Sequence, residues 1–129
     1  MNYLSDLLVS LVGIAFAMTI HEFGHAFAAY LLGDDTAKRA GRMTINPANH
    51  IDIVGLVMLM IFHFGWAKPV PVNPNNFKNY RVGNFIVSLA GAAGNLVGAI
   101  ICALILKFSP MYAISIIAAT ALNYNLWFA

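Results

Sequence analysis

The chain has 129 residues, of which 60% are hydrophobic and only 9% are charged, and its formal net charge at pH 7 is +2. A soluble domain carries about 25% charged residues, so this chain has too few charges to cover a water-facing surface. The mean hydropathy of +0.76 favours a membrane protein. The small net charge and the absence of a basic run exclude nucleic acid as the expected partner. The length is that of one unit, and the lone Cys102 excludes an intramolecular disulfide.

The first predicted element is a helix over residues 4–32, which contains no charge from Leu7 to Ile20. Its 29 residues would extend roughly 44 Å, more than the roughly 30 Å of a hydrocarbon core. Gly33 followed by Asp34 and Asp35 predicts the end of the helix, with both carboxylates in solvent. No Lys or Arg precedes the apolar run and no small-residue cleavage site follows it. We therefore expect a retained membrane helix and not a signal peptide.

The middle of the chain alternates polar and apolar segments. A polar linker over residues 36–50 is followed by an apolar segment, 51–64, that is short for a membrane span. Six of the seven Lys and Arg lie in the two linkers that flank this segment. If the segment crossed the bilayer these linkers would face opposite sides, so the basic bias predicts a re-entrant segment. Residues 65–83 are predicted as a cytoplasmic-side loop, extended where prolines alternate at Pro69 and Pro71.

Two further spans are predicted over residues 84–108 and 111–129. The earlier one carries Gly91, Gly94 and Gly98, small residues that let a neighbouring helix approach closely. The predicted fold is an all-α integral membrane protein, one membrane-embedded unit over residues 1–129. It has about three transmembrane helices and a re-entrant or extended segment between the first and second. The charge pattern predicts an N-terminus outside the cell.

The motif His21-Glu22-Phe23-Gly24-His25 lies inside the first apolar run. Two histidines at i and i+4 share one helix face and can hold a zinc ion. Glu22 lies beside them and could take a proton from a zinc-bound water. Ionisable groups in so apolar a segment are costly, which favours a functional role. The alternative is that the motif residues form a hydrogen-bonded polar cluster between helices.

A third protein ligand is needed, because a hydrolytic zinc has three of them and one open position for water. His50 and Asp52 are weak candidates that could reach the metal if residues 51–64 fold back on the first helix. A structural role at the membrane surface is favoured for both. His63, beside an aromatic cluster, is predicted to be an interfacial residue, and Asp34 and Asp35 are too far past the helix end. The residues alone leave the third ligand open.

The chain also resembles the compact bacterial subgroup of the site-2 protease family of intramembrane zinc metalloproteases, over about residues 20–129. The metal motif alone occurs in many soluble metalloproteases, but its ordered combination with the later segments is specific. These segments are Leu31-Leu32-Gly33-Asp34, Ala40-Gly41-Arg42, Asn46-Pro47, His50-Ile51-Asp52, Gly65-Trp66-Ala67-Lys68-Pro69-Val70-Pro71-Val72-Asn73, and Ala90-Gly91 with Asn95.

The resemblance implies a multi-pass protease of the cell membrane that cuts single-pass transmembrane protein substrates within the bilayer, with its active site toward the cytoplasm. It implies Zn²⁺ held by His21 and His25, with Glu22 as general base, and a helix-packing role for Asn95. A substrate-binding loop near the active-site entrance is also implied, where an extended edge could pair with a locally unwound substrate. That loop comprises Lys68, Pro69, Val70 and Pro71.

Two features depart from the family pattern. Ala92 stands where the family usually has proline. The family takes its third zinc ligand from an aspartate in an N-x-x-P-x-x-P-x-D-G stretch, which is expected here beyond Ala129, so the chain resembles a C-terminally truncated core. Two other functions are weighed: an inactive membrane module that binds zinc or substrate, and a small ion-transporter subunit. A transporter is disfavoured because the ionisable residues form no relay across the bilayer.

Overall fold

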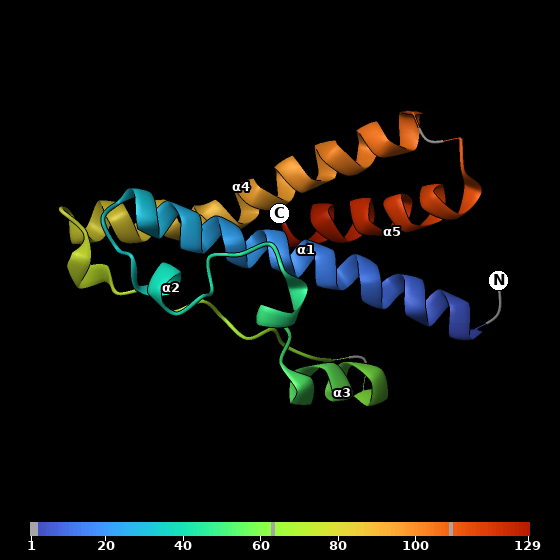
Figure 1. Cartoon of the computed structure of the whole chain (residues 1–129), viewed down its shortest axis with the longest axis horizontal. Helices are drawn as coiled ribbons and strands as arrows, with labels where there is room; N and C mark the ends of the chain where they lie inside the picture. Colours follow the sequence, from blue (N-terminus) through green and yellow to red (C-terminus); the bar gives the residue numbers. More distant parts are fainter. Residues whose placement is uncertain (1–2, 63, 109) are drawn as a thin grey trace.

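Three long helices form the body of the computed structural model, which describes residues 3–62, 64–108 and 110–129. These helices, α1 (Tyr3–Leu31), α4 (Tyr80–Phe108) and α5 (Tyr112–Phe128), each pack against the other two (Figure 1). The described residues are helical apart from short connections and one isolated β-bridge, which confirms the all-α prediction. The shorter elements are α2 (Thr36–Arg39), η1 (Pro47–Asn49), α3 (Ile53–Phe62) and η2 (Pro74–Asn76).

The end of α1 is set by Gly33, whose φ of +103° is left-handed backbone that glycine adopts without strain. The Asp34 N–H donates to the Ala29 carbonyl at 2.9 Å, and the Gly33 N–H donates to the Tyr30 carbonyl at 3.1 Å. This pair of bonds is a Schellman motif, which satisfies the last carbonyls of the helix. The predicted end at Leu32 is therefore correct to within one residue.

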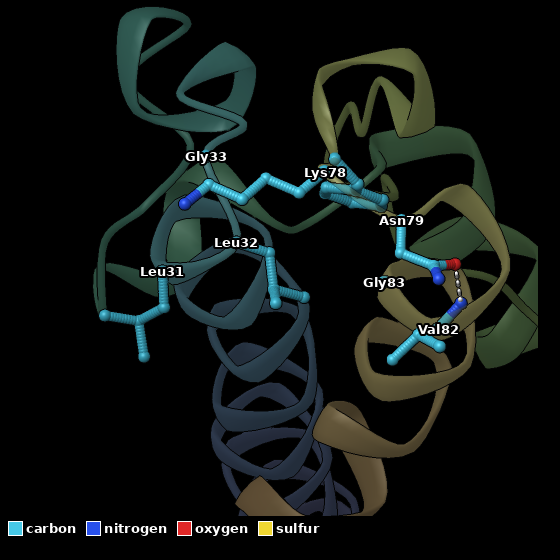
Figure 2. Close-up of a pocket in the computed structure, with 8 residues that line it drawn as sticks. Leu31, Leu32, Gly33, Lys78, Asn79, Val82 and Gly83 are labelled. Atoms are coloured by element: carbon cyan, nitrogen blue, oxygen red, sulfur yellow. Dashed lines mark hydrogen bonds between the residues drawn. The ribbon is translucent and has the colours of Figure 1, made fainter.

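The start of α4 lies at Tyr80, earlier than the Asn84 expected from hydropathy. The reason is a local cap: the Asn79 side-chain oxygen accepts a hydrogen bond from the Val82 N–H at 3.1 Å (Figure 2). A side chain that satisfies one of the free amides at a helix start extends the helix into polar sequence. The helix therefore begins about one turn before the residue at which hydropathy marks its start.

Helix α3 lies beside the three-helix body without packing on it (Figure 1). The two ends of its segment meet, because Ile51 and Ala67 form an antiparallel bridge and the Lys68 N–H donates to the His50 carbonyl at 2.8 Å. The helix also touches the returning chain closely: a Cβ on Gly55 would lie 2.1 Å from the Trp66 carbonyl oxygen. The segment thus leaves and returns at one place, while its position in a membrane remains a prediction.

The packing of the helices inverts the pattern of a soluble protein. Alanine and glycine dominate the buried positions, whereas most of the large apolar side chains of α4 are exposed and those of α1 are exposed or half-buried. Both helices are long and apolar enough to cross a membrane, judged by length and composition. Only 17% and 28% of their apolar windows are buried inside the molecule, whereas a soluble core helix would be mostly buried. Close contact through small residues is typical of membrane helices.

Helix α5 has 17 residues and would extend about 26 Å, slightly less than a hydrocarbon core. Its role as a third span, like the re-entrant position of residues 51–64, remains a prediction.

Candidate metal centre

The two histidines of the motif lie one turn apart on α1 and face α4. Their ring centroids are 4.7 Å apart, with the ring planes at 82°. A Cβ placed on Gly91 of α4 would lie 2.5 Å from His21 Nε2 and 2.6 Å from His25 Nε2. The two nitrogens therefore converge on one point, and the missing side chain of Gly91 leaves that point open.

The other nitrogen of each ring is held by α4. His25 Nδ1 lies 2.6 Å from the Val87 carbonyl oxygen. A carbonyl oxygen only accepts hydrogen bonds, so the His25 ring donates from its Nδ1–H. That bond places the proton on Nδ1 and leaves the Nε2 lone pair free. A carbonyl partner behind a histidine is the usual arrangement for a histidine that binds a metal.

His21 is oriented by Asn95, whose Nδ2 lies 2.9 Å from His21 Nδ1. Asn95 is fully buried, and its Oδ1 has no hydrogen-bond partner in the described part of the chain. Turning the amide by 180° would bring Oδ1 against Nδ1, so that His21 would donate from Nδ1 and keep the Nε2 lone pair free. The buried, unpartnered oxygen therefore fits the tautomer that a metal ion requires.

These two nitrogens and the open point beside Gly91 fit a zinc ion bound on one side by two histidines. Within residues 3–62, 64–108 and 110–129, however, no group of three His, Cys, Asp or Glu gathers as metal ligands. The described residues thus supply two converging ligands.

Helices α1 and α4 pack closely beside the histidines. A Cβ on Gly24 would lie 2.4 Å from the Ala90 carbonyl oxygen, and one on Gly94 would lie 2.9 Å from the Ile20 carbonyl oxygen. Glycine in the motif and glycine on α4 therefore let the two backbones touch beside the histidines.

Glu22, between the histidines in sequence, points to the loop that follows α3. Its Oε2 accepts a hydrogen bond from the Val70 N–H at 2.8 Å. The structure thus brings the Lys68–Pro71 loop of the sequence analysis beside the motif.

Three side chains hold this loop in place. Arg42 donates from Nη2 to the Lys68 carbonyl at 2.6 Å and to the Pro69 carbonyl at 3.3 Å. Asp34 accepts from the Asn73 N–H at 2.7 Å. Together with Glu22, these residues fix the loop and the chain just beyond it at Asn73.

Asp34 corrects one expectation, because it was predicted to be a solvated charge and is fully buried. Besides Asn73, its carboxylate accepts bonds from the Thr36 N–H and hydroxyl and from Asn76 Nδ2. Burial by itself raises the pKa of Asp34, but these hydrogen bonds favour the ionised form and hold the pKa below its usual value. Asp35 is partly exposed and pairs with Arg39 at the surface.

The weak candidates for a third ligand have other partners. His50 is 1% exposed, and its Nε2 lies 2.7 Å from the Thr44 carbonyl oxygen. Asp52 caps α3 by accepting a hydrogen bond from the Gly55 N–H at 2.9 Å. Neither joins the motif histidines as a cluster in the described part of the chain. His63 lies outside the described residues.

A separate hollow of about 290 Å³ lies where the end of α1 meets the start of α4 (Figure 2). Its lining includes Leu32, Phe77 and Val82, with the Lys78 side chain extending across it. None of the motif residues lines it, so it is distinct from the histidine pair.

Sequence reasoning missed Asp34, Arg42 and the Val70 N–H as groups around the site. The two side chains lie in segments that carried the family resemblance, but nothing in their local pattern marks burial or contact with the loop. A main-chain donor carries no sequence signal at all.

Comparison with known proteins agrees with the site. The chain is 40% identical over 113 residues to the Bacillus subtilis protein named "Putative zinc metalloprotease YwhC", covering 88% of this chain and 52% of that protein. It is 32% identical over 106 residues to "Putative zinc metalloprotease Rip2" of Mycolicibacterium smegmatis, covering 78% of this chain and 40% of the relative. The Rip2 protein of Mycobacterium tuberculosis is 30% identical over 118 residues, covering 87% and 46%.

The chain thus spans about half the length of the curated relatives that it matches. No protein-family model and no solved structure matches it. These relatives, together with two converging histidines beside a glutamate, define the class: this chain is homologous to bacterial proteins named as zinc metalloproteases.

Proposed function

We propose that this chain is the core of an intramembrane zinc metalloprotease of the site-2 protease type. The observation that carries the proposal is the convergence of His21 and His25 Nε2 on the open point beside Gly91, inside a long apolar helix. The names of the relatives support zinc and proteolysis. Cleavage inside a bilayer is the step that goes beyond those names.

Each residue of the motif has a distinct task in this proposal. His21 and His25 hold the ion through Nε2, with Asn95 and the Val87 carbonyl fixing the ring orientations. Zinc, when bound, polarises the substrate carbonyl and makes a bound water acidic enough to act as a nucleophile. Glu22 accepts the proton of the attacking water and delivers it to the departing amine of the cleaved peptide bond.

The membrane setting is supported by the exposed apolar surface of α1 and α4. In Figure 1 the start of α1, the end of α4 and the start of α5 lie at one end of the bundle, and α2 lies toward the other. Most Lys and Arg belong to the segments between α1 and α4, at α2 and around α3. By the positive-inside rule we place those segments, and the active site, toward the cytoplasm, with α5 as a third span and residues 51–64 re-entrant.

The loop beside Glu22 supports a transmembrane substrate. A peptide bond in an intact helix is shielded from an attacking water, so a transmembrane substrate must unwind locally. The Lys68–Pro71 loop forms no helix and lies next to the candidate base. We propose that it receives the unwound substrate as an extended segment.

In the family that the chain resembles, an aspartate supplies the third ligand, and the described residues bring no third ligand to the histidine pair. Helix α5 approaches the site: Asn125 contacts α4 at Gly98, one turn from Asn95. An inactive zinc- or substrate-binding module is the alternative, and it keeps the histidine pair while lacking turnover.

The test uses the full-length protein reconstituted with a single-pass transmembrane substrate. We expect Glu22→Gln to reduce cleavage by about 10²-fold or more while bound zinc is unchanged, since a positioned general base contributes roughly 10²–10⁴-fold. The paired control, His21→Ala with His25→Ala, should lose zinc as well as cleavage. Retained cleavage in Glu22→Gln would show that Glu22 is not the general base. A wild-type protein that binds the transmembrane substrate without cleaving it would favour the inactive binding module.

A further inference from the structure

We propose that the main-chain N–H of Val70 is a positioning group for Glu22, and that Arg42 and Asp34 clamp the loop so that this amide meets the carboxylate. The inference rests on the proposed function, because it concerns the orientation of the candidate base. The group in question is a main-chain N–H, which no side-chain motif in the sequence reveals.

The first argument is the bonding of Glu22. In the described part of the chain, the Val70 N–H is the hydrogen-bond donor to this carboxylate, and it reaches Oε2 at 2.8 Å. A glutamate side chain has three rotatable bonds, so a single fixed contact removes much of its freedom. A bond to Oε2 leaves Oε1 to take a proton from water.

The second argument is the identity of the neighbours. Pro69 and Pro71 flank Val70, and proline has no N–H and a fixed φ. Val70 therefore carries the only amide proton between Lys68 and Val72, on a stretch of chain that is already stiff. A donor in such a segment needs little additional ordering to be aimed at a carboxylate.

The third argument is the set of clamps around this amide. On one side, Arg42 holds the Lys68 and Pro69 carbonyls, and the Lys68 N–H donates to the His50 carbonyl. On the other side, the buried Asp34 carboxylate accepts the Asn73 N–H. The loop is thus fixed on both sides of Val70.

The decisive comparison uses proline as a probe for the amide. Val70→Pro removes the N–H and keeps the chain extended. Val72→Pro is the matched control, because the Val72 N–H makes no hydrogen bond within the described residues. A merely structural effect of an added proline would appear in both proline variants.

For the full-length enzyme with a transmembrane substrate, we expect Val70→Pro to lower kcat about tenfold, with KM and bound zinc nearly unchanged. A tenfold loss is the lower end of what losing one hydrogen bond to a charged group produces. Val72→Pro should stay within about twofold of wild type. Equal rates for Val70→Pro and Val72→Pro would overturn the inference, and a faster Val70→Pro enzyme would mean that the amide restrains Glu22 instead of positioning it.

A second measurement does not depend on activity. Residues 68–73 contain only four exchangeable amides, at Lys68, Val70, Val72 and Asn73. In hydrogen–deuterium exchange, Glu22→Ala should release the protection of the Val70 amide, and Asp34→Asn should release Asn73 and Val70 together. Unchanged protection in both variants would overturn the inference even in an active protease. If the variants lose amide protection but the protein never cleaves a substrate, the proposed function is refuted. The contact between Glu22 and the Val70 N–H is then still supported.

Discussion

Asn95 on α4 contacts Nδ1 of His21 on α1 at 2.9 Å, although 74 positions separate the two residues in sequence. The contact orients the ring so that Nε2 faces the open point beside Gly91. Helix packing therefore does more than bury α1, because it also fixes the orientation of the His21 ring.

Replacing Asn95 tests this relationship. We expect Asn95→Ala to weaken zinc binding by about 10- to 100-fold, the usual cost of removing a group that orients a metal-bound histidine. Zinc affinity by competition with a chelator is the measurement. Leu96→Ala, on the exposed side of the same helix, is the control and should bind zinc as wild type does. Equal affinity for the two variants would show that Asn95 serves packing alone.

Gly91 offers a steric test of the same site. A Cβ at this position would lie within 2.6 Å of both Nε2 atoms, closer than non-bonded atoms approach. Gly91→Ala should therefore abolish zinc binding while the protein remains helical by circular dichroism. Ala93→Val adds volume on the exposed face of α4 and should leave zinc bound. Normal zinc content in Gly91→Ala would mean that the metal, if any, lies elsewhere.

Asp34 predicts a pH-dependent contribution to stability. Its folded-state pKa lies below the unfolded value, so ionisation stabilises the folded state. The contribution is complete above the unfolded pKa, about 3.9, and is lost as pH falls from there through the folded pKa. Asp34→Asn should lower stability at neutral pH by about 2 kcal/mol, the typical value for hydrogen bonds to a charged group, and should flatten this acid dependence.

Thermal unfolding in detergent between neutral and acidic pH measures both effects. Asp35→Asn is the matched control, because Asp35 is a neighbouring carboxylate that is partly exposed and pairs with Arg39 at the surface. Such pairs contribute about 0–1 kcal/mol. Equal losses for the two variants would contradict the buried role of Asp34.

The remaining two predictions concern the loop and the base. Glu22→Gln should separate zinc binding from cleavage, and Val70→Pro should lower kcat where Val72→Pro does not. Together they ask whether the contact of 2.8 Å between Glu22 and the Val70 N–H has a role in turnover.

Several parts of this molecule were predictable because they depend on neighbours in sequence. The all-helical fold follows from long apolar runs, and the end of α1 follows from Gly33. The start of α4 was less predictable, because hydropathy marks the apolar region and not the Asn79 cap that precedes it. Asp34 was placed in solvent because a glycine followed by two aspartates usually marks a solvated helix end.

The sequence by itself determined that His21 and His25 share one helix face with Glu22 beside them, since spacing on a helix is a local property. Only the tertiary structure decided what faces them. The approach of α1 and α4 at Gly24 and Gly91 fixes the rotation of each helix, and with it the contacts of Asn95 and Val87 to the rings. The contact of Val70 with Glu22 likewise depends on clamps that join segments far apart in the chain, which no local pattern encodes.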